Sequence, residues 1–552
     1  MTRKDLADFM YKDVTKTVYD YDNIYKKRNT SGIVTRFAPS PTGFVHMGSL
    51  LTAFIAKKVT VDTNGIFYLR IEDTDNKRLV DNGINGIISD LKKYDISIDE
   101  GVISENEEIG EYGPYIQSKR IDIYNTYIKY LIENDYAYPC FCTSEELDDI
   151  RSGQEERKEK VGYYGKYAKC RELPIEEVMK RIRNGEKYVI RIKSRGQEGR
   201  KIVLNDLVRG KIEFQENDID HIIVKSNGIP VYHFAHVIDD HLMRTTHVLR
   251  GEEWLSSVPL HIELFKMLNF EVPKYAHLGL VMKIDENGVR RKLSKRLDPE
   301  ASLSYYHTKG IPVEAVKLYL LTIANSNFEE WYNCNKDKDI NSFKFDFKKV
   351  SESGTLFDIE KLMNISKNYL SRLSCDEVYE GLSAYTKEYD YPFYLELTKN
   401  PEYSKRVLNI ERERKNPRKD YSSYSEIFGY VNYMYSKYFD YTYKNVDDLV
   451  KFNYELLRDY IDNYFDITSE EEWYNKVKEI SGIYNYSVNV KDYKLEPDKY
   501  NGHIGNVCEM IRVIVTGRTV SPSLYEILRV LGKEEVIKRF NMFLERQASN
   551  KM

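Results

Sequence analysis

The sequence contains little cysteine and no long hydrophobic run. Six cysteines scattered over 552 residues cannot form a disulfide framework, and this usage favours a reducing compartment. The longest apolar stretch, 315–324, is broken by Lys317 and Thr322 and is shorter than the about 18 residues of a membrane span. The first 30 residues have no apolar signal-peptide core, and their five aspartates argue against a transit peptide. We therefore expect a cytoplasmic protein that does not associate with membranes.

An excess of one charge sign is also absent. The 83 Lys and Arg residues face 87 Asp and Glu residues, a formal net charge of −4, so no global basic excess indicates nucleic acid. This sum is compatible with a local basic patch. Charged residues make up 31%, hydrophobic residues 41% and the mean hydropathy is −0.57, which is typical of a globular protein. At about 150 residues per domain, the length predicts three or four domains.

The first part of the chain has the pattern of an α/β fold. A short strand is expected over 33–37, followed by a Pro/Gly turn over 38–43. A helix with one apolar face begins at about residue 47, and a buried strand is expected over 66–71. This β-turn-α-turn-β order predicts the opening of a parallel α/β domain.

The rest of the chain predicts an insertion and then a helical half. The α/β alternation resumes near 222–224, which leaves a charge-rich insertion over about 138–221. Pro312 begins a strong helix, and beyond residue 300 amphipathic helical patterns dominate. Residues 1–30 have the pattern of a charged helical appendage.

The turn within 36–49 combines the features of a phosphate-binding site. A strand, a tight turn and a helix N-terminus direct backbone N–H groups and the positive end of a helix dipole to one point. Gly48 lets a flat group such as a base approach the backbone, and His46 is placed to hydrogen-bond a nucleotide phosphate. The alternative is a histidine that only caps the helix, which is the commoner role of an isolated His-x-Gly.

A basic loop is the second candidate functional feature. Residues 291–296 read Arg-Lys-Leu-Ser-Lys-Arg, and four cations on a loop can neutralise charge that builds on a triphosphate. Alone, such a run is usually a solvated face. Together with the turn in 36–49, it suits adenylate transfer.

Longer motifs run through the chain in order. Residues 36–43 read Arg-Phe-Ala-Pro-Ser-Pro-Thr-Gly, and residues 69–75 read Leu-Arg-Ile-Glu-Asp-Thr-Asp. Further motifs occupy 113–118, 232–241, 250–257 and 516–522. The set resembles class I aminoacyl-tRNA synthetases, and glutamyl-tRNA synthetases of the bacterial type in particular. Residues 46–49 resemble the HIGH motif of that class and residues 292–296 its KMSKS motif, and the resemblance extends from about residue 32 to 540.

The resemblance implies an activity. It implies ATP-dependent ligation of L-glutamate to tRNA(Glu) through a glutamyl-adenylate, with release of AMP and pyrophosphate. Mg²⁺ would accompany ATP, tRNA(Gln) is a further candidate substrate, and a monomer is expected. No covalent enzyme intermediate is expected, because positioning and charge stabilisation are sufficient for such a displacement. Two alternatives are a glutaminyl-tRNA synthetase and a small-acid adenylating ligase that does not act on tRNA.

The resemblance also implies roles for individual residues. The expected catalytic residues are His46, Lys292 and Lys295. The expected glutamate-binding residues are Arg36, Ala38, Ser40, Glu72, Tyr232, His236 and Arg250. The expected ATP-binding residues are Pro39, Gly43, His46, Gly48, Ser49, Glu253 and Lys295.

The chemistry of the substrate agrees with this assignment. Arg36 and Arg250 can each pair with a carboxylate as planar forks, and Glu72 can pair with the ammonium group. The alternative for each of these three residues is a structural role. At position 236 this chain has a histidine where relatives have other residues.

The implied architecture is a split Rossmann-like catalytic domain with an insertion, followed by helical domains. Its expected parts are an N-terminal extension (1–31), the catalytic domain (32–137 and 222–300), an inserted acceptor-binding domain (138–221), a stem-contact region (301–380) and a helical anticodon-binding domain (381–552).

Three cysteines of the insertion have spacing that suits a metal. Cys140 and Cys142 are followed 28 residues later by Cys170, and some relatives bind zinc here with three cysteines and a fourth ligand. A neighbouring tyrosine or water is the candidate fourth ligand. Reduced thiols without a metal are the alternative.

A basic patch in the helical half is the strongest indication of tRNA contact. Residues 405–419 contain seven Lys and Arg residues against two Glu residues. The candidate tRNA contacts are Arg412, Arg414, Lys415 and Arg418. A solvated helix-loop face is the alternative.

Overall fold

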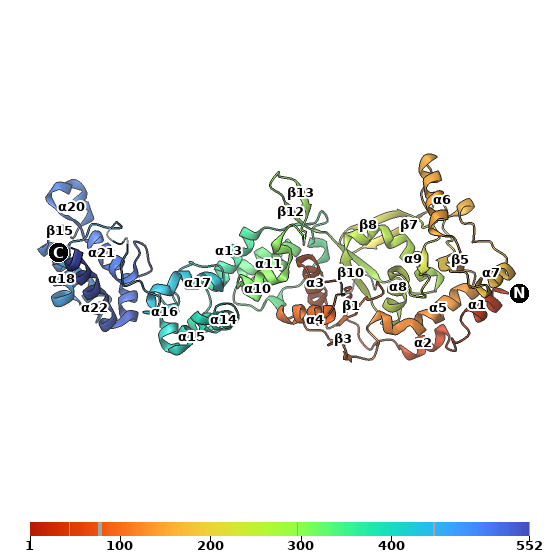
Figure 1. The fold of residues 1–552 in the computed structure, drawn as a ribbon, viewed down its shortest axis with the longest axis horizontal. Helices are drawn as coiled ribbons and strands as arrows, with labels where there is room; N and C mark the ends of the chain where they lie inside the picture. The colour runs from red at the N-terminus through yellow and green to blue at the C-terminus, as the bar shows by residue number, and fades with distance from the viewer. Residues whose placement is uncertain (44, 76–79, 295, 445, 447, 551–552) are drawn as a thin grey trace. The chain divides into compact units, whose positions relative to one another are not determined.

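The computed structural model describes residues 1–43, 45–75, 80–294, 296–444, 446 and 448–550. The chain forms two compact units (Figure 1). The first comprises Met1–Tyr305 and Lys317–Asp358, and the second comprises Tyr306–Val316 and Ile359–Met552. Within the part of the chain that is described, no helix is both long and apolar enough to cross a membrane.

A parallel sheet forms the centre of the first unit. β1 (Val34–Phe37) pairs in parallel with β2 (Ile66–Leu69), and β2 pairs in parallel with β3 (Glu100–Val102). The short β4 (Glu108–Ile109) closes the edge in the antiparallel direction. All four residues of β1 are buried, as expected for a strand covered on both faces. The β-turn-α-turn-β unit predicted from the sequence is therefore present.

A second pair of parallel strands continues the sheet beside β1. β10 (His247–Gly251) pairs with β11 (Lys274–Leu278), and the N–H of Thr246 donates to the carbonyl of Val34 over 2.9 Å. The helix α3 (Met47–Thr63) packs on β1, β2 and β10. The start of α3 and the C-terminal ends of β1 and β10 thus lie at the same edge of the sheet.

The inserted segment builds its own small sheets. β5 (Ala137–Cys140), β6 (Val189–Ile192) and β9 (Ile222–Val224) form an antiparallel sheet in that order. β7 (Lys201–Asp206) and β8 (Gly210–Gln215) form a hairpin. The strand expected at 222–224 is present, but it pairs with β6 and not with the parallel sheet, which resumes only at β10.

The N-terminal segment is packed into the first unit. α1 (Arg3–Met10) packs on α5 (Ile121–Glu133), and α2 (Val18–Ile24) also contacts α5. The guanidinium of Arg28 pairs with both carboxylate oxygens of Glu100, at 2.6 and 2.9 Å. The charged helical appendage expected at 1–30 is therefore helical, and it is anchored rather than detached.

In its described residues the second unit is helical, as the sequence predicts, apart from a two-stranded pair of β15 (Tyr486–Ser487) and β16 (Gly502–His503). Its helices are α13 (Ile359–Leu370), α14 (Cys375–Tyr389), α15 (Tyr391–Lys399), α16 (Pro401–Leu408), α17 (Tyr424–Val431), α18 (Tyr454–Asp459), α19 (Glu470–Ile483), α20 (Val490–Leu495), α21 (Ile504–Thr516) and α22 (Leu524–Asn550). The chain passes between the units within α10 (Leu303–Thr308), within α11 (Val313–Ala324) and again directly before α13.

The first unit also contains further helices and a three-stranded sheet in the order β13-β12-β14. They are α4 (Gly83–Lys93), α6 (Ser144–Glu156), α7 (Ile175–Arg183), α8 (Tyr232–Leu242), α9 (Val258–Met267), β12 (Val281–Ile284), β13 (Arg290–Lys292), α12 (Phe328–Cys334) and β14 (Thr355–Leu356).

Candidate active site

A cavity of about 740 Å³ lies at the edge of the parallel sheet where β1 and β10 end and α3 begins. Most of the residues expected at the site line it: Arg36, Ala38, Pro39, Ser40, His46, Gly48, Ser49, Glu72, Tyr232, Arg250, Glu253 and Lys292. Within the described residues, its wall does not include Gly43 or His236. Lys295 lies outside the described residues. The volume is in the range of pockets that bind small molecules.

His46 occupies the N-cap of α3. Its Nδ1 accepts a hydrogen bond from the N–H of Ser49 at 3.1 Å, and its ring also lies 3.0 Å from the hydroxyl of Ser49. A Cβ at Gly48 would lie 3.1 Å from the ring, so a larger residue there would crowd the imidazole. The capping role considered from the sequence is therefore present, and the same ring lines the cavity at a helix N-terminus.

Arg36 projects from β1 into a buried charge network. Its Nε lies 3.1 Å from Oδ1 of Asp240, which also accepts from Nη1 of Arg70 at 2.7 Å. Nη2 of Arg70 donates to Glu72 over 2.9 Å. The structural ion pair considered for Arg36 is therefore present, and the same side chain lines the cavity.

Burial and charge oppose each other at Glu72. Burial raises the pKa of its carboxyl group, against the lowering effect of Arg70 and Arg36, and the net shift is upward. An acid whose pKa is raised and whose side chain lines a cavity is a candidate partner for a substrate cation. A substrate ammonium group would add a partner that favours the ionised form.

Arg250 projects from β10 on the other side of the cavity. Its Nε donates to Nε2 of His277 over 3.1 Å, and its Nη1 lies 3.2 Å from Nδ1 of His261. The guanidinium lies over the ring of Tyr275, 4.8 Å from its centre. Its Nη2 is buried and has no hydrogen-bond partner among the described residues. The side chain is 5% exposed and is ready to donate to a ligand.

Three further residues of this environment were not predicted from the sequence: His261, His277 and Asp206. His277 lies in the buried strand β11 between the apolar residues Ala276 and Leu278, and a polar side chain buried in such a strand needs a partner. That is the only signal the sequence offered. The partner, Asp206, is 71 residues away, so no local pattern could have identified it.

Tyr232 begins α8 and forms an aromatic wall of the cavity. Its ring lies 4.3 Å from that of Trp254 and is stacked on His236 at 5.4 Å. Burial raises the pKa of its hydroxyl, so the phenol is protonated and can donate a hydrogen bond.

His236 lies behind Tyr232, and the expectation that it contacts the substrate is not met. Its Nδ1 lies 2.9 Å from Oδ2 of Asp240, and its Nε2 is buried without a partner among the described residues. Burial lowers its pKa to about 3, so the imidazole is neutral. It supports the carboxylate that holds Arg36.

The basic loop presents one described cation to the cavity. Lys292 at the end of β13 lines it, opposite Met282 of β12. Arg291 instead forms a two-pronged ion pair with Asp298, at 2.6 and 2.8 Å. This pair anchors the loop on which Lys292 lies.

The three cysteines of the inserted segment lie together at the end of β5. Their sulfur atoms all lie within 4.8 Å of one another, and those of Cys142 and Cys170 are 3.7 Å apart. Tetrahedral zinc with bonds of about 2.3 Å places its sulfur ligands about 3.8 Å apart. Three thiols at this spacing suit a metal of this kind, and the hydroxyl of Tyr163 lies 3.2 Å from Sγ of Cys142.

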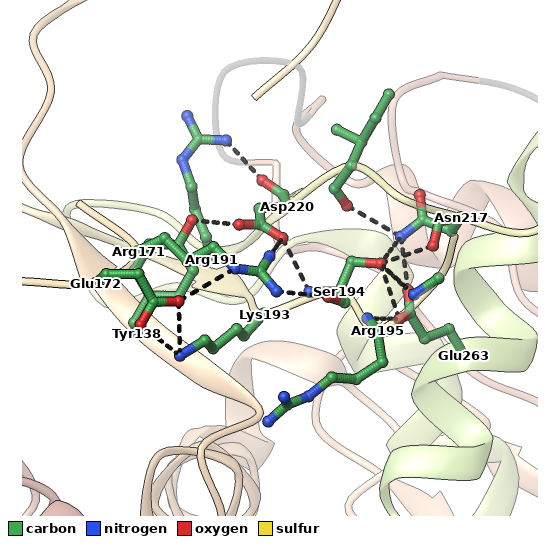
Figure 2. Close-up of polar contacts among 12 residues, drawn as sticks. Tyr138, Arg171, Glu172, Arg191, Lys193, Ser194, Arg195, Asn217, Asp220 and Glu263 are labelled. Carbon is green, nitrogen blue, oxygen red and sulfur yellow. Dashed lines mark hydrogen bonds and ion pairs between the residues drawn. The ribbon is translucent and has the colours of Figure 1, made fainter. Parts of the chain in front are cut away.

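Asp220 fixes the backbone beside this cluster. Figure 2 shows its carboxylate paired with Arg171, which follows Cys170, and accepting from the N–H of Ser194 at 2.9 Å. Asp220 is fully buried. One carboxylate thus links the residue that follows Cys170 to the backbone at Ser194.

Glu263 of α9 joins the inserted segment to the catalytic half of the unit. Its carboxylate accepts from the N–H of Arg195 and from the side-chain amide of Asn217, each at 2.6 Å (Figure 2). The hydroxyl of Ser194 donates to it at 2.9 Å. These bonds fix the position of α9 relative to the strands of the insertion.

In the second unit, the basic patch is largely neutralised. Arg412 is buried, and its guanidinium donates to the carbonyls of Leu408 and Leu370 at 3.0 and 2.6 Å. Arg412 therefore has a structural role. It is not exposed for the tRNA contact that the sequence predicts. Arg414 pairs with Glu526, and Arg418 with Asp420; Lys415 is exposed.

Comparison with known proteins agrees with this geometry. The family model described as tRNA synthetases class I (E and Q), catalytic domain, matches residues 32–364, and an anticodon binding domain matches residues 391–544. The chain is 44% identical over 548 residues to the glutamate–tRNA ligase of Acetivibrio thermocellus, covering 99% of this chain and 100% of the relative. It is 42% identical over 555 residues to that of Clostridium beijerinckii, with 99% and 100% covered.

Solved structures show the same relationship. The crystal structure of a glutamate tRNA ligase from Elizabethkingia meningosepticum in complex with its amino acid superposes with a TM-score of 0.75 at 28% identity. The match covers 93% of this chain and 99% of that one. By its two matching domains and its relatives along almost its full length, the chain belongs to the glutamate–tRNA ligases, a family of class I tRNA synthetases.

Proposed function

We propose that this chain ligates L-glutamate to tRNA(Glu) through a glutamyl-adenylate, with ATP consumed and AMP and pyrophosphate released. One observation carries the proposal: Arg36, Arg250 and Glu72, from separate strands and loops, converge on a single cavity. Two cationic forks and one carboxylate complement the two carboxylates and the ammonium group of glutamate. The names of the relatives support the same reaction.

Glutamate occupies the part of the cavity between β1 and β10. Arg36 and Arg250 bind its carboxylates, and Glu72 binds its ammonium group. Tyr232 forms the wall and donates a hydrogen bond, and the backbone at Ala38 and Ser40 completes the pocket. His236 acts indirectly, through Asp240.

ATP occupies the part of the cavity at the start of α3. Its phosphates lie at the helix N-terminus with His46 and Ser49, which favours anions. Pro39, Gly48 and Glu253 line the nucleotide side. Mg²⁺ enters with the triphosphate as part of the substrate. Lys295 belongs to the same basic loop by sequence and lies outside the described residues.

The chemistry consists of two displacements without a covalent enzyme intermediate. The α-carboxylate of glutamate attacks the α-phosphorus of ATP, and pyrophosphate leaves. A terminal ribose hydroxyl of the tRNA then attacks the adenylate carbonyl, loses its proton, and AMP leaves. Lys292 and the helix N-terminus stabilise the negative charge that builds on the phosphates.

The remaining regions hold the tRNA, in a monomeric enzyme. The inserted segment over 138–221 binds the acceptor end, and the region over 301–380 contacts the stem. The helical region over 381–552 binds the anticodon, with Lys415, Arg414 and Arg418 as contacts to phosphates. The match of residues 391–544 to an anticodon binding domain supports this assignment.

A structural zinc ion is held by Cys140, Cys142 and Cys170, with the hydroxyl of Tyr163 as the fourth ligand. It would cross-link the end of β5 to the chain at Cys170 and would take no part in the reaction. Metal analysis of the purified protein should find one zinc per chain, and Cys142→Ser should remove it. Cys334→Ser is the matched control, because Cys334 is exposed and remote from the cluster in sequence. Wild-type protein prepared with zinc but containing none would refute the assignment.

The function is tested by attaching labelled glutamate to purified tRNA(Glu) and to tRNA(Gln), with glutamine as the control amino acid. Glutamate on tRNA(Glu) alone identifies a discriminating enzyme, and glutamate on both tRNAs identifies a non-discriminating one. Attachment of glutamine to tRNA(Gln) would identify the chain as a glutaminyl-tRNA synthetase. Adenylation of glutamate without charging of any tRNA would identify a ligase that does not act on tRNA.

A further inference from the structure

Arg250 is held by histidines rather than by carboxylates. Its Nε donates to His277 and its Nη1 to His261. Its Nη2 is buried without a partner among the described residues. A guanidinium held at one edge presents the other edge in a fixed plane. The orientation of Arg250 therefore depends on its two histidine acceptors.

The acceptor His277 is itself oriented by a buried carboxylate. Its Nδ1 lies 2.7 Å from Oδ2 of Asp206, so Nδ1 carries the proton and Nε2 is left as the acceptor for Arg250. His277 is fully buried and Asp206 is 4% exposed. Burial lowers the pKa of His277, although Asp206 opposes this shift, so the imidazole is neutral.

From this chain of contacts, we propose that Asp206 and His277 are positioning residues for glutamate: Asp206 fixes the tautomer of His277, and His277 fixes the plane of Arg250. Neither residue lines the cavity within the described part of the chain. The proposal rests on the role proposed above for Arg250.

Asp206 comes from the inserted segment, at the end of β7. The same carboxylate accepts from the N–H groups of Val208 and Arg209 at 3.0 Å, which closes the hairpin turn. Arg209 then donates to the carbonyl of His277 over 3.2 Å and pairs with Glu252. The turn of the hairpin is thus fastened to the strand that carries His277.

The second acceptor of Arg250 is also supported by the insertion. His261 lies on α9, two residues before Glu263, whose carboxylate is held by Arg195 and Asn217 (Figure 2). Because a guanidinium only donates, Nδ1 of His261 is the acceptor for Arg250, and its Nε2 carries the proton toward Nδ1 of His233, 2.9 Å away. The inserted segment therefore contacts His277 directly, and it contacts the helix that carries His261 through Glu263.

Substitutions can distinguish a role in orienting Arg250 from a role in stabilising the fold. In Asp206→Asn, a side-chain amide that donates to Nδ1 would move the proton of His277 to Nε2, where it faces the N–H of Arg250. In His277→Gln, an amide oxygen can still accept from Arg250, whereas in His277→Phe no acceptor remains. The three variants therefore differ in whether Nε of Arg250 has an acceptor.

The test is steady-state ATP–pyrophosphate exchange by the full-length chain with tRNA(Glu) present. We expect His277→Phe and Asp206→Asn to raise the KM for glutamate about 10-fold or more, the effect of losing one buried hydrogen bond to a charged group. The KM for ATP should stay within about 2-fold, and His277→Gln should recover most of the loss. Melting temperatures establish that each variant is folded.

The outcomes distinguish this inference from the proposed function. Arg250→Lys should raise the KM for glutamate strongly; if it does not, Arg250 does not bind glutamate and both proposals fail. If Arg250→Lys has this effect but His277→Phe and Asp206→Asn do not, the positioning role alone is overturned. Equal rises in both KM values would also overturn it. If His277→Phe does not fold, Asp206→Asn and His277→Gln decide the question.

Discussion

Arg36 and Asp240 form an ion pair in the interior of the first unit, with Nε and Oδ1 3.1 Å apart and the two side chains 4% and 0% exposed. Asp240 also pairs with Arg70 at 2.7 Å. Burial raises the pKa of the Asp240 carboxyl group, but Arg36 and Arg70 outweigh this effect and hold the pKa well below its usual range. Asp240 thus contacts two buried cations, and Glu72 supplies a second carboxylate to Arg70.

Removal of the Asp240 carboxylate should destabilise the first unit. Asp240→Ala leaves Arg36 and Arg70 without it, and breaking a buried ion pair costs about 3–5 kcal/mol. Scanning calorimetry should show a lower unfolding temperature for the first unit. Asp13→Ala, on an exposed residue, is the control and should change stability by less than about 0.5 kcal/mol. Equal unfolding temperatures for the two variants would contradict the role of Asp240.

Glu72 should give glutamate binding a pH dependence. Only the ionised carboxylate pairs with an ammonium group, and its pKa is raised by burial. The kcat/KM for glutamate should therefore fall as the pH drops through this raised pKa, at a higher pH than an ordinary glutamate would give. Glu72→Gln should lower kcat/KM about 10- to 100-fold at neutral pH and remove this acidic limb. Glu271→Gln, on an exposed residue, should keep the wild-type profile.

Lys292 should act on the rate of adenylate formation more than on glutamate binding. It is the described cation of the basic loop that lines the cavity, and it would stabilise charge that develops on the phosphates. Lys292→Ala should lower kcat about 100- to 1,000-fold in ATP–pyrophosphate exchange, with the KM for glutamate little changed. Lys274→Ala, also an exposed lysine, should have wild-type kinetics. If the KM for glutamate rises and kcat does not fall, Lys292 contributes to substrate binding and not to stabilisation of the transition state.

Arg412 and Lys415, three residues apart, should behave differently. Arg412→Ala leaves buried carbonyls at Leu370 and Leu408 without their donor and should destabilise the second unit by about 3 kcal/mol. Lys415→Ala should leave stability unchanged, weaken tRNA binding and reduce its salt-dependence slope by about 1. Filter binding at several salt concentrations measures the slope. Unchanged binding and slope would exclude Lys415 as a phosphate contact.

The sequence predicted those parts of the fold that depend on local patterns. The strand, turn and helix of β1 and α3 follow from apolar runs separated by Pro and Gly, and the structure has them at the expected residues. Strand partners are not local, however. The sequence predicts that the α/β alternation resumes with the strand at 222–224, but the structure pairs this strand with β6, more than 30 residues earlier.

The candidate site was predictable to the extent that its residues lie in contiguous motifs. Arg36, Glu72 and Arg250 each belong to such a motif, and the structure brings them to one cavity. Asp206 and His277 could not be predicted, because their roles arise from a contact across 71 residues of sequence. The error at Arg412 has a related cause: sequence gives the charge of a side chain but not whether it is buried.

The histidine acceptors of Arg250 have a consequence for the choice between glutamate and glutamine. Asp240 and Glu72 balance the charges of Arg36 and Arg70, whereas His261 and His277 are neutral and leave the charge of Arg250 uncompensated. Arg250 is therefore a buried cation that lines the cavity without an ion-pair partner among the described residues. We expect the side-chain carboxylate of glutamate to supply this partner, which the neutral amide of glutamine cannot do, so discrimination against glutamine would need no steric barrier.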